Sequence, residues 1–78
     1  MADEREACEL IEFIAKALVD DTEAVKVTLS NDGQTLELEA DAEDRGRVIG
    51  RQGRVAKAMR ALLGASSFGS GLRLDIVD

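Results

Sequence analysis

Two glycines separated by two residues are the feature of this sequence that most directly indicates chemistry. Gly50 and Gly53 follow an apolar pair, Val48 and Ile49, and precede a segment with helical periodicity. Glycine has no Cβ atom, so the backbone can turn tightly there and a phosphodiester can approach closely. The helix expected after Gly53 begins with unpaired N–H groups and the positive end of its dipole. The spacing therefore predicts a phosphate-binding turn, which we call the Gly-x-x-Gly turn (residues 50–53).

The residue types around this turn favour an outside acceptor over an internal one. Gly53 occupies the N-cap position of the expected helix, so no Ser, Thr, Asp or Asn side chain is available to the first N–H groups. Arg51, Arg54 and Lys57 lie around the same helix end, where each cation costs about 0.3–1 kcal/mol in an isolated helix. A locally unfavourable choice of this kind often marks a functional site, and a bound phosphate would turn the repulsion into attraction.

Charge is distributed unevenly along the 78 residues, whose net charge is −6. One segment, residues 45–60, holds six basic side chains and no acidic one: Arg45, Arg47, Arg51, Arg54, Lys57 and Arg60. The rest of the chain carries all 16 acidic residues and four basic ones, a net charge of −12. The overall charge argues against a nucleic-acid partner, whereas the local charge predicts an anion-binding patch. The alternative for the basic segment is an ordinary solvated helix face.

Hydropathy patterning predicts the element order helix, strand, strand, helix, helix, strand. Residues 3–19 repeat apolar side chains at helical spacing, and residues 25–29, 35–40 and 72–77 alternate as strands do. An Asn-Asp-Gly turn joins the first two strands. The second helix is expected to begin with Asp41 as its N-cap and to stop at Gly50. Because two helices separate the last two strands, these strands are expected to be parallel neighbours joined by a right-handed crossover.

These elements predict an α+β fold, with a three-stranded mixed sheet and helices packed on one face, in a single domain spanning residues 1–78. On the first helix, Cys8 is expected to be a small core residue and not a reactive thiol. Phe13, at the edge of the apolar face, is also expected in the core, with a partner contact as the alternative. The third helix is expected to bury a face made of Val55, Met59, Leu62 and Leu63.

Missing residue types exclude several functional classes. The absence of His and the single Cys remove zinc sites built on His or several cysteines, Ser-His and Cys-His catalysis, and haem ligation by His. Without Trp or Tyr, and with two Phe, a base-stacking aromatic platform is not expected. The acidic stretches are interpreted as solvated faces, so we expect no enzyme, no catalytic residue, no metal site and no cofactor.

The same composition bears on location. No apolar run approaches the ~18–20 residues that a membrane span needs, and the charged N-terminus lacks the apolar region of a signal peptide. A single cysteine fits a reducing compartment. We therefore expect a cytoplasmic protein without a membrane partner.

Other glycine motifs for nucleotides and nucleic acids match less well. A P-loop requires Gly-x4-Gly-Lys-Ser/Thr and a dinucleotide fold requires Gly-x-Gly-x-x-Gly, and neither is present. Helix–hairpin–helix DNA binders also place a glycine hairpin between two helices, but typically with Gly-x-Gly spacing. That class remains an alternative.

The stretch GRVIGRQGR, residues 46–54, resembles the signature of the K-homology (KH) domain. The order of elements resembles its type II, prokaryotic arrangement. From Arg5 to Asp78 the chain is similar to the small single-KH bacterial RNA-binding proteins of the KhpA type, with support from residues 13–20 and 74–78.

The resemblance implies a type II KH fold that grips about four nucleotides of single-stranded RNA. The RNA-binding residues it implies are a clamp loop (Gly50, Arg51, Gln52 and Gly53) and an apolar groove wall (Val48, Ile49 and Val55). The basic side chains of Arg47, Arg54 and Lys57 surround them and complete the expected site. It also implies an RNA chaperone in post-transcriptional regulation, acting with a second KH-containing, Jag-like partner. In some bacteria that pair is linked to cell-wall synthesis and cell elongation.

A protein-interaction module is the second alternative. One small clamp gives little affinity, so dimerisation with a second copy or with a KH-containing partner would help through avidity. Ala58, Ala61 and Ala65 form a small-residue side of the third helix that permits close helix approach, and Phe68 is a further candidate contact. Ordinary intramolecular packing is the other interpretation of the alanines.

Overall fold

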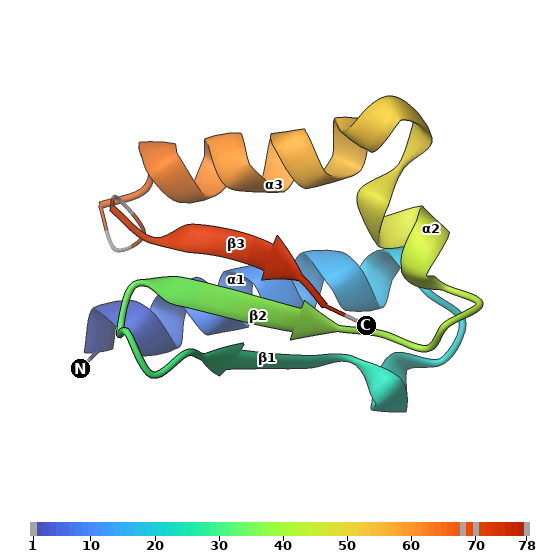
Figure 1. Cartoon of the computed structure of the whole chain (residues 1–78), viewed down its shortest axis with the longest axis horizontal. Coiled ribbons are helices and arrows are strands. Elements are labelled where there is room, and N and C mark those ends of the chain that lie inside the picture. Colours follow the sequence, from blue (N-terminus) through green and yellow to red (C-terminus); the bar gives the residue numbers. More distant parts are fainter. Residues whose placement is uncertain (1, 68, 70, 78) are drawn as a thin grey trace.

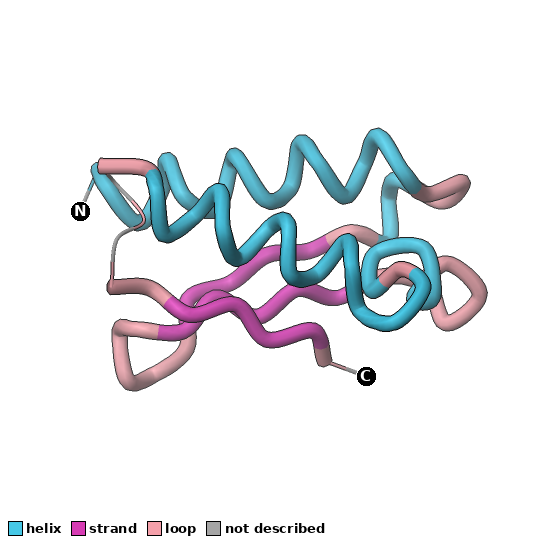
Figure 2. Tube along the Cα trace, turned by 90° about the horizontal axis from the view of Figure 1, so that it is seen from above, coloured by secondary structure: helices cyan, strands magenta, loops and turns pink. Residues whose placement is uncertain are grey.

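The computed structural model describes residues 2–67, 69 and 71–77, which form one sheet with helices on one of its faces (Figures 1 and 2). In chain order the elements are α1 (Ala2–Leu18), η1 (Thr22–Ala24), β1 (Lys26–Leu29), β2 (Thr35–Glu39), α2 (Arg45–Ile49), η2 (Arg51–Gly53), α3 (Arg54–Ala65) and β3 (Arg73–Ile76). The 3₁₀ turns η1 and η2 add to the expected order, which is otherwise confirmed. Among the described residues, no helix has the length and apolar character needed to span a membrane.

The central strand of the sheet is β2. It pairs with β1 in antiparallel fashion, with Thr28 opposite Glu37, and with β3 in parallel fashion, with Leu36 opposite Leu74. The parallel pair follows because α2 and α3 carry the chain back along the sheet before β3 begins. The predicted α+β fold with a mixed sheet is therefore confirmed. Figure 2 shows the long helices α1 and α3 on the same side of the strands.

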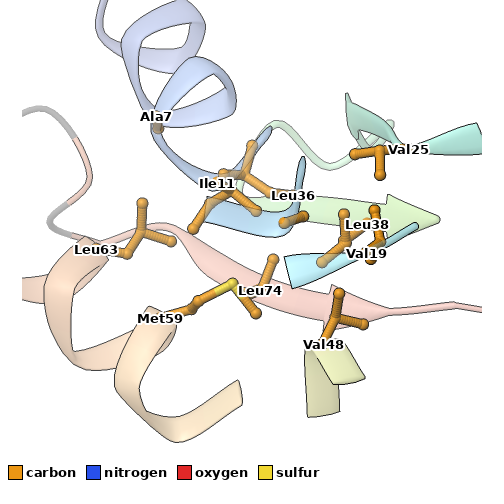
Figure 3. Packing of buried hydrophobic residues seen from close by; sticks show 11 residues of the cluster. Ala7, Ile11, Val19, Val25, Leu36, Leu38, Val48, Met59, Leu63 and Leu74 are labelled. Carbon is orange, nitrogen blue, oxygen red and sulfur yellow. The ribbon is translucent and has the colours of Figure 1, made fainter. Parts of the chain in front are cut away.

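The core lies between the sheet and the two long helices (Figure 3). Its largest fully buried side chains are Ile11, Leu36, Leu38, Val48, Met59 and Leu63. On α1 the buried residues recur every four positions, which is close to one helical turn, whereas on β2 they alternate with period two. Burying one such side chain is worth about 1.5–3 kcal/mol. A few contacts therefore hold both helices, and with them the turn between α2 and α3, against the sheet.

Two apolar residues expected in the core are exposed instead. Phe13 is 74% exposed, because it follows buried Ile11 by two residues and so points to the far side of α1. Leu62 is 53% exposed, while Ala56 takes a place on the buried face of α3 with Met59 and Leu63. Ala56, Met59 and Leu63 fall within a narrow arc of the helix, and Leu62 lies beyond the edge of that arc. The expectation for both side chains was wrong.

The start of α2 also differs from the expectation. The helix begins at Arg45, so Asp41 is not its N-cap. Asp41 instead closes a separate turn: its side chain accepts the N–H of Glu43 at 3.3 Å, and its carbonyl accepts the N–H of Asp44 at 2.9 Å. Asp44 takes the cap position, but its side chain accepts no backbone N–H of this helix.

Cys8 is partly buried and packs against the core. Burial, followed by the nearby carboxylates of Glu12, Glu4 and Glu9, raises the pKa of the Cys8 thiol. The thiol therefore remains protonated at neutral pH and is a weak nucleophile, in line with the expected structural role. Phe68, the other candidate contact named from the sequence, lies outside the described residues.

The β1–β2 hairpin is held by one carboxylate. Asp32 accepts the N–H groups of Gln34 at 2.8 Å and Thr35 at 3.1 Å, together with the hydroxyls of Ser30 and Thr35. The hydrogen bond from Ser30, followed by those from Gln34 and Thr35, lowers the pKa of Asp32. A carboxylate whose folded-state pKa is lowered stabilises the fold above its unfolded-state pKa, and this contribution is lost as the pH falls through the folded-state value.

We expect Asp32→Ala to lower the free energy of unfolding at neutral pH, because four donors lose their acceptor. The difference between the variant and the parent should narrow as the pH falls below the ordinary aspartate value of about 3.9. Urea unfolding over a series of pH values measures this difference. Asn31→Ala, in the same turn, is the control; a difference for Asp32→Ala that does not change with pH would contradict the prediction.

Candidate nucleic-acid interface

The chain changes direction between α2 and α3 within the Gly-x-x-Gly turn (Figure 1). Three of its four residues have positive φ angles: 79° at Gly50, 58° at Gln52 and 74° at Gly53. One backbone hydrogen bond closes it, from the N–H of Gly53 to the carbonyl of Gly50 at 3.0 Å. Glycine adopts positive φ at little cost, so two of the three strained positions carry the residue best suited to them.

The two glycines have different surroundings. A Cβ atom at Gly50 would lie 2.8 Å from the backbone nitrogen of Val55 and 2.5 Å from its Cγ2. No side chain fits there unless the start of α3 moves away. A Cβ atom at Gly53 would meet nothing within 4 Å. Gly50 therefore allows the close packing of the turn, while the position beside Gly53 is open to a ligand.

Gln52 is the non-glycine residue of the described chain with a positive φ. The left-handed conformation costs an L-residue about 1–2 kcal/mol. The exposed side chain gains little in return, since its one hydrogen bond, from Nη2 of Arg54 to Oε1, is long at 3.5 Å. Backbone strain of this type clusters at functional sites.

The positive end of α3 lies open beside this turn. Gly53 provides no side-chain cap, and the first turn of α3 has no acidic residue. Arg51, Arg54 and Lys57 are exposed, and they form no ion pair with any residue that the structure describes. The helix end and its three cations together favour an anion.

Two other members of the basic segment have partners within the chain. Nη1 of Arg47 lies 3.0 Å from Oδ2 of Asp20 and 3.6 Å from Oδ1 of Asp44. Arg60 donates from Nε to the carbonyl of Leu74 at 3.1 Å, which ties α3 to strand β3. The structure therefore divides the predicted basic patch into unpaired cations at the turn and cations that hold elements together.

The apolar residues beside the turn divide in a similar way. Ile49 is 37% exposed and Val55 is partly buried, so both present surface next to the turn. Val48 is fully buried in the core. Of the three residues expected to line a groove, Val48 therefore supports the wall from inside, and Ile49 and Val55 provide the accessible surface.

The described residues contain no group of three or more His, Cys, Asp or Glu side chains that could hold a metal ion. The interface is thus built from backbone donors, cations and two apolar side chains. Such a set suits the binding of a phosphodiester and the apolar parts of a nucleotide.

A Gly-x-x-Gly turn between two helices, on a three-stranded mixed sheet with the order α-β-β-α-α-β, defines a KH domain of type II. The family model described as "KhpA/KhpB, KH domain" matches residues 8–76, and the chain belongs to this family. KH domains of this family are not enzymes, in agreement with the expectation from the sequence.

Curated relatives are similar over nearly the whole chain. RNA-binding protein KhpA of Treponema pallidum is 49% identical over 74 residues, covering 90% of this chain and 92% of that protein. RNA-binding protein KhpA of Halalkalibacterium halodurans is 45% identical over 73 residues, covering 88% and 96%. That of Streptomyces coelicolor is 42% identical over 72 residues, covering 90% of each. No solved structure matches the chain.

We expect Gly50→Ala to lower the free energy of unfolding more than Gly53→Ala. The second change costs about 1–2 kcal/mol through backbone conformation alone, and the first adds the contact with Val55. Urea unfolding measures both. Gly46→Ala, at an open helical position of α2, should be neutral or stabilising by about 0.5–1 kcal/mol. If Gly50→Ala proved as mild as Gly46→Ala, the close approach to Val55 would not constrain the turn.

Proposed function

We propose that this protein binds single-stranded RNA, with a backbone phosphate seated on the Gly-x-x-Gly turn. The observation that carries the proposal is the uncapped start of α3, open beside Gly53 and surrounded by three cations that form no ion pair with any described residue. The names of the curated relatives, RNA-binding protein KhpA, support RNA as the nucleic acid.

The proposed roles follow from position. Gly50 and Gly53 shape the turn, and the backbone of the first turn of α3 faces the phosphate. Arg51, Arg54 and Lys57 supply positive charge, and Gln52 offers a polar side chain at the tip. Ile49 and Val55 contact the sugar or the base, in place of the aromatic stacking that this chain lacks. A single strand is favoured because its bases are free to meet such a surface.

We extend the proposal to the wider roles that the family resemblance implies. The protein would be a cytoplasmic single KH domain (residues 1–78) and an RNA chaperone. It would act in post-transcriptional regulation with a Jag-like KH partner, in processes that include cell-wall synthesis and cell elongation. One domain offers a single phosphate-binding turn of four residues, and this supports such a partner, because linking two weak sites raises the affinity for one RNA.

Self-association is a second candidate function, and the exposure of Leu62 favours it. Ala58, Ala61, Leu62 and Ala65 are exposed and share one side of α3, away from the core. A leucine flanked by small residues allows two helices to approach closely and bury an apolar contact. Membership of the KH family removes support for the helix–hairpin–helix DNA-binding alternative.

The double variant Arg51→Asp, Gln52→Asp tests RNA binding. We expect it to abolish binding while the fold remains, because both side chains are exposed and new negative charges would face the phosphate. Fluorescence anisotropy with a labelled single-stranded oligoribonucleotide measures affinity, and circular dichroism measures the fold. For the parent, affinity should fall with salt, with a log–log slope of about −0.7 for each phosphate contact.

A variant with the same change in net charge, Arg5→Asp with Gln34→Glu, is the matched control for this experiment. Both positions are exposed and lie outside the proposed interface. The control should bind nearly as well as the parent. If the double variant in the turn bound RNA as tightly as this control, the assignment of the clamp would be wrong.

Leu62→Lys tests self-association. We expect the parent to form a dimer at micromolar concentrations and the variant to remain a monomer, because a charge replaces the exposed leucine at the contact. Sedimentation velocity over a concentration series measures both. Phe13→Lys, at another exposed apolar residue on α1, should leave the parent's behaviour unchanged. A parent that stays monomeric at the highest concentration would remove the homodimer.

A further inference from the structure

Among the residues whose burial the structure describes, Asp44 is the charged residue classed as buried, with 5% of its surface exposed. Its carboxylate accepts the backbone N–H of Asp21 at 3.0 Å and that of Asp20 at 3.4 Å. A buried charge is tolerated only where hydrogen bonds or an opposite charge compensate for lost hydration. The compensation here comes from the segment that follows α1, more than twenty residues earlier in the chain.

Arg47 completes the arrangement. Its Nη1 atom lies 3.0 Å from Oδ2 of Asp20 and 3.6 Å from Oδ1 of Asp44. One turn of α2 and the end of α1 are thus joined by a carboxylate that accepts two backbone N–H groups and by a cation between two carboxylates. We call Asp20, Asp44 and Arg47 the α1–α2 brace.

The brace acts on the helix that leads into the Gly-x-x-Gly turn. With five residues, α2 is too short to be stable or to keep a direction by itself. Its placement depends on what it contacts: the core through Val48, and the end of α1 through the brace. Gly50, at its C-terminal end, must approach Val55 closely. A change in the direction of α2 would therefore shift the turn relative to the start of α3.

We infer that Asp44 and Arg47 are positioning residues for the RNA clamp, and that Arg47 does not itself contact phosphate. The inference rests on the proposed function and deepens it. Arg47 is already neutralised by two carboxylates, unlike the cations at the turn. It contributes to RNA affinity by holding α2 in the orientation that presents the turn.

The salt dependence of RNA binding separates a positioning arginine from one that contacts phosphate. Arg51→Gln should reduce the magnitude of the log–log slope by about 0.7, the value for one lost phosphate contact on a single strand. Arg47→Gln should lower the affinity but leave the slope at the parent's value. A slope reduced by Arg47→Gln as much as by Arg51→Gln would overturn the inference for Arg47.

Asp44→Ala tests the brace from its buried side. We expect the affinity for the same oligoribonucleotide to fall, because the carboxylate that joins the start of α2 to the segment after α1 is lost. Asp44→Asn, which keeps one oxygen acceptor, should recover part of this loss and provides a folded variant if the alanine variant fails to fold. Ile11→Val removes a methyl group from the buried face of α1. It is the control for a lower stability of the fold that leaves α2 and the turn in place.

An NMR measurement without RNA keeps the inference distinguishable from the proposed function. In Asp44→Asn the backbone amide signals of Gly50, Arg51 and Gly53 should shift, and in Ile11→Val they should remain in place. The positioning role would be overturned if those signals did not move in Asp44→Asn, or if Asp44→Asn bound RNA as tightly as Ile11→Val. The turn signals could shift while the parent shows no salt-dependent RNA binding. In that case the proposed function fails, and so does the role of the brace in RNA binding. The effect of the brace on the position of the turn would still stand.

Discussion

The close approach of Gly50 to Val55 is the constraint on which the proposed interface depends. The chain must leave α2 and enter α3 within four residues, and the first of them lies against the backbone nitrogen of Val55, the second residue of α3. Only a residue without a side chain fits there. Because the turn is this tight, the N-terminus of α3 emerges at the surface while Met59 and Leu63, farther along the helix, reach the core.

The charges of the chain follow from the same geometry. Seen as a total, −6 describes a protein that nucleic acid should avoid. On the structure, three exposed cations that form no ion pair with a described residue gather at the turn, whereas others serve the fold: Arg47 in the α1–α2 brace and Arg60 at strand β3. An acidic remainder weakens attraction to polyanions in general, and a strand seated on the turn still meets positive charge at short range. Local charge, not the total, decides what the surface can bind.

The sequence was sufficient to predict features set by local pattern. The period of the apolar residues defined α1 and the three strands, and Gly50 and Gly53 located the turn, because a positive φ and a close approach leave a clear trace in residue type. Boundaries and exposure at the edges of a face were predicted less well. Phe13, Leu62 and Asp41 were misplaced because each satisfied the local pattern, while the outcome depended on how the helices and loops met the rest of the fold.

The role of Asp44 left no trace in the local sequence. Its partners lie after α1, and no helical or strand spacing relates positions so far apart. With Asp41 as the expected N-cap, Asp44 would occupy the first turn of the helix, where a carboxylate suits the dipole and needs no distant partner. In three dimensions it is buried and accepts hydrogen bonds from the segment that follows α1. Long-range hydrogen bonds of a buried carboxylate become visible only once the elements are packed.

The turn carries three positive φ angles. The strain at Gln52 and the uncapped end of α3 are costs of the folded domain, offset by the core and by the α1–α2 brace. A backbone held in its binding conformation by the fold reduces the entropy lost on association. It suits a chain without aromatic stacking, in which a rigid backbone and three cations must supply most of the affinity. The same rigidity makes the interface sensitive to the residues behind it, because a small domain has few contacts with which to restore a displaced α2.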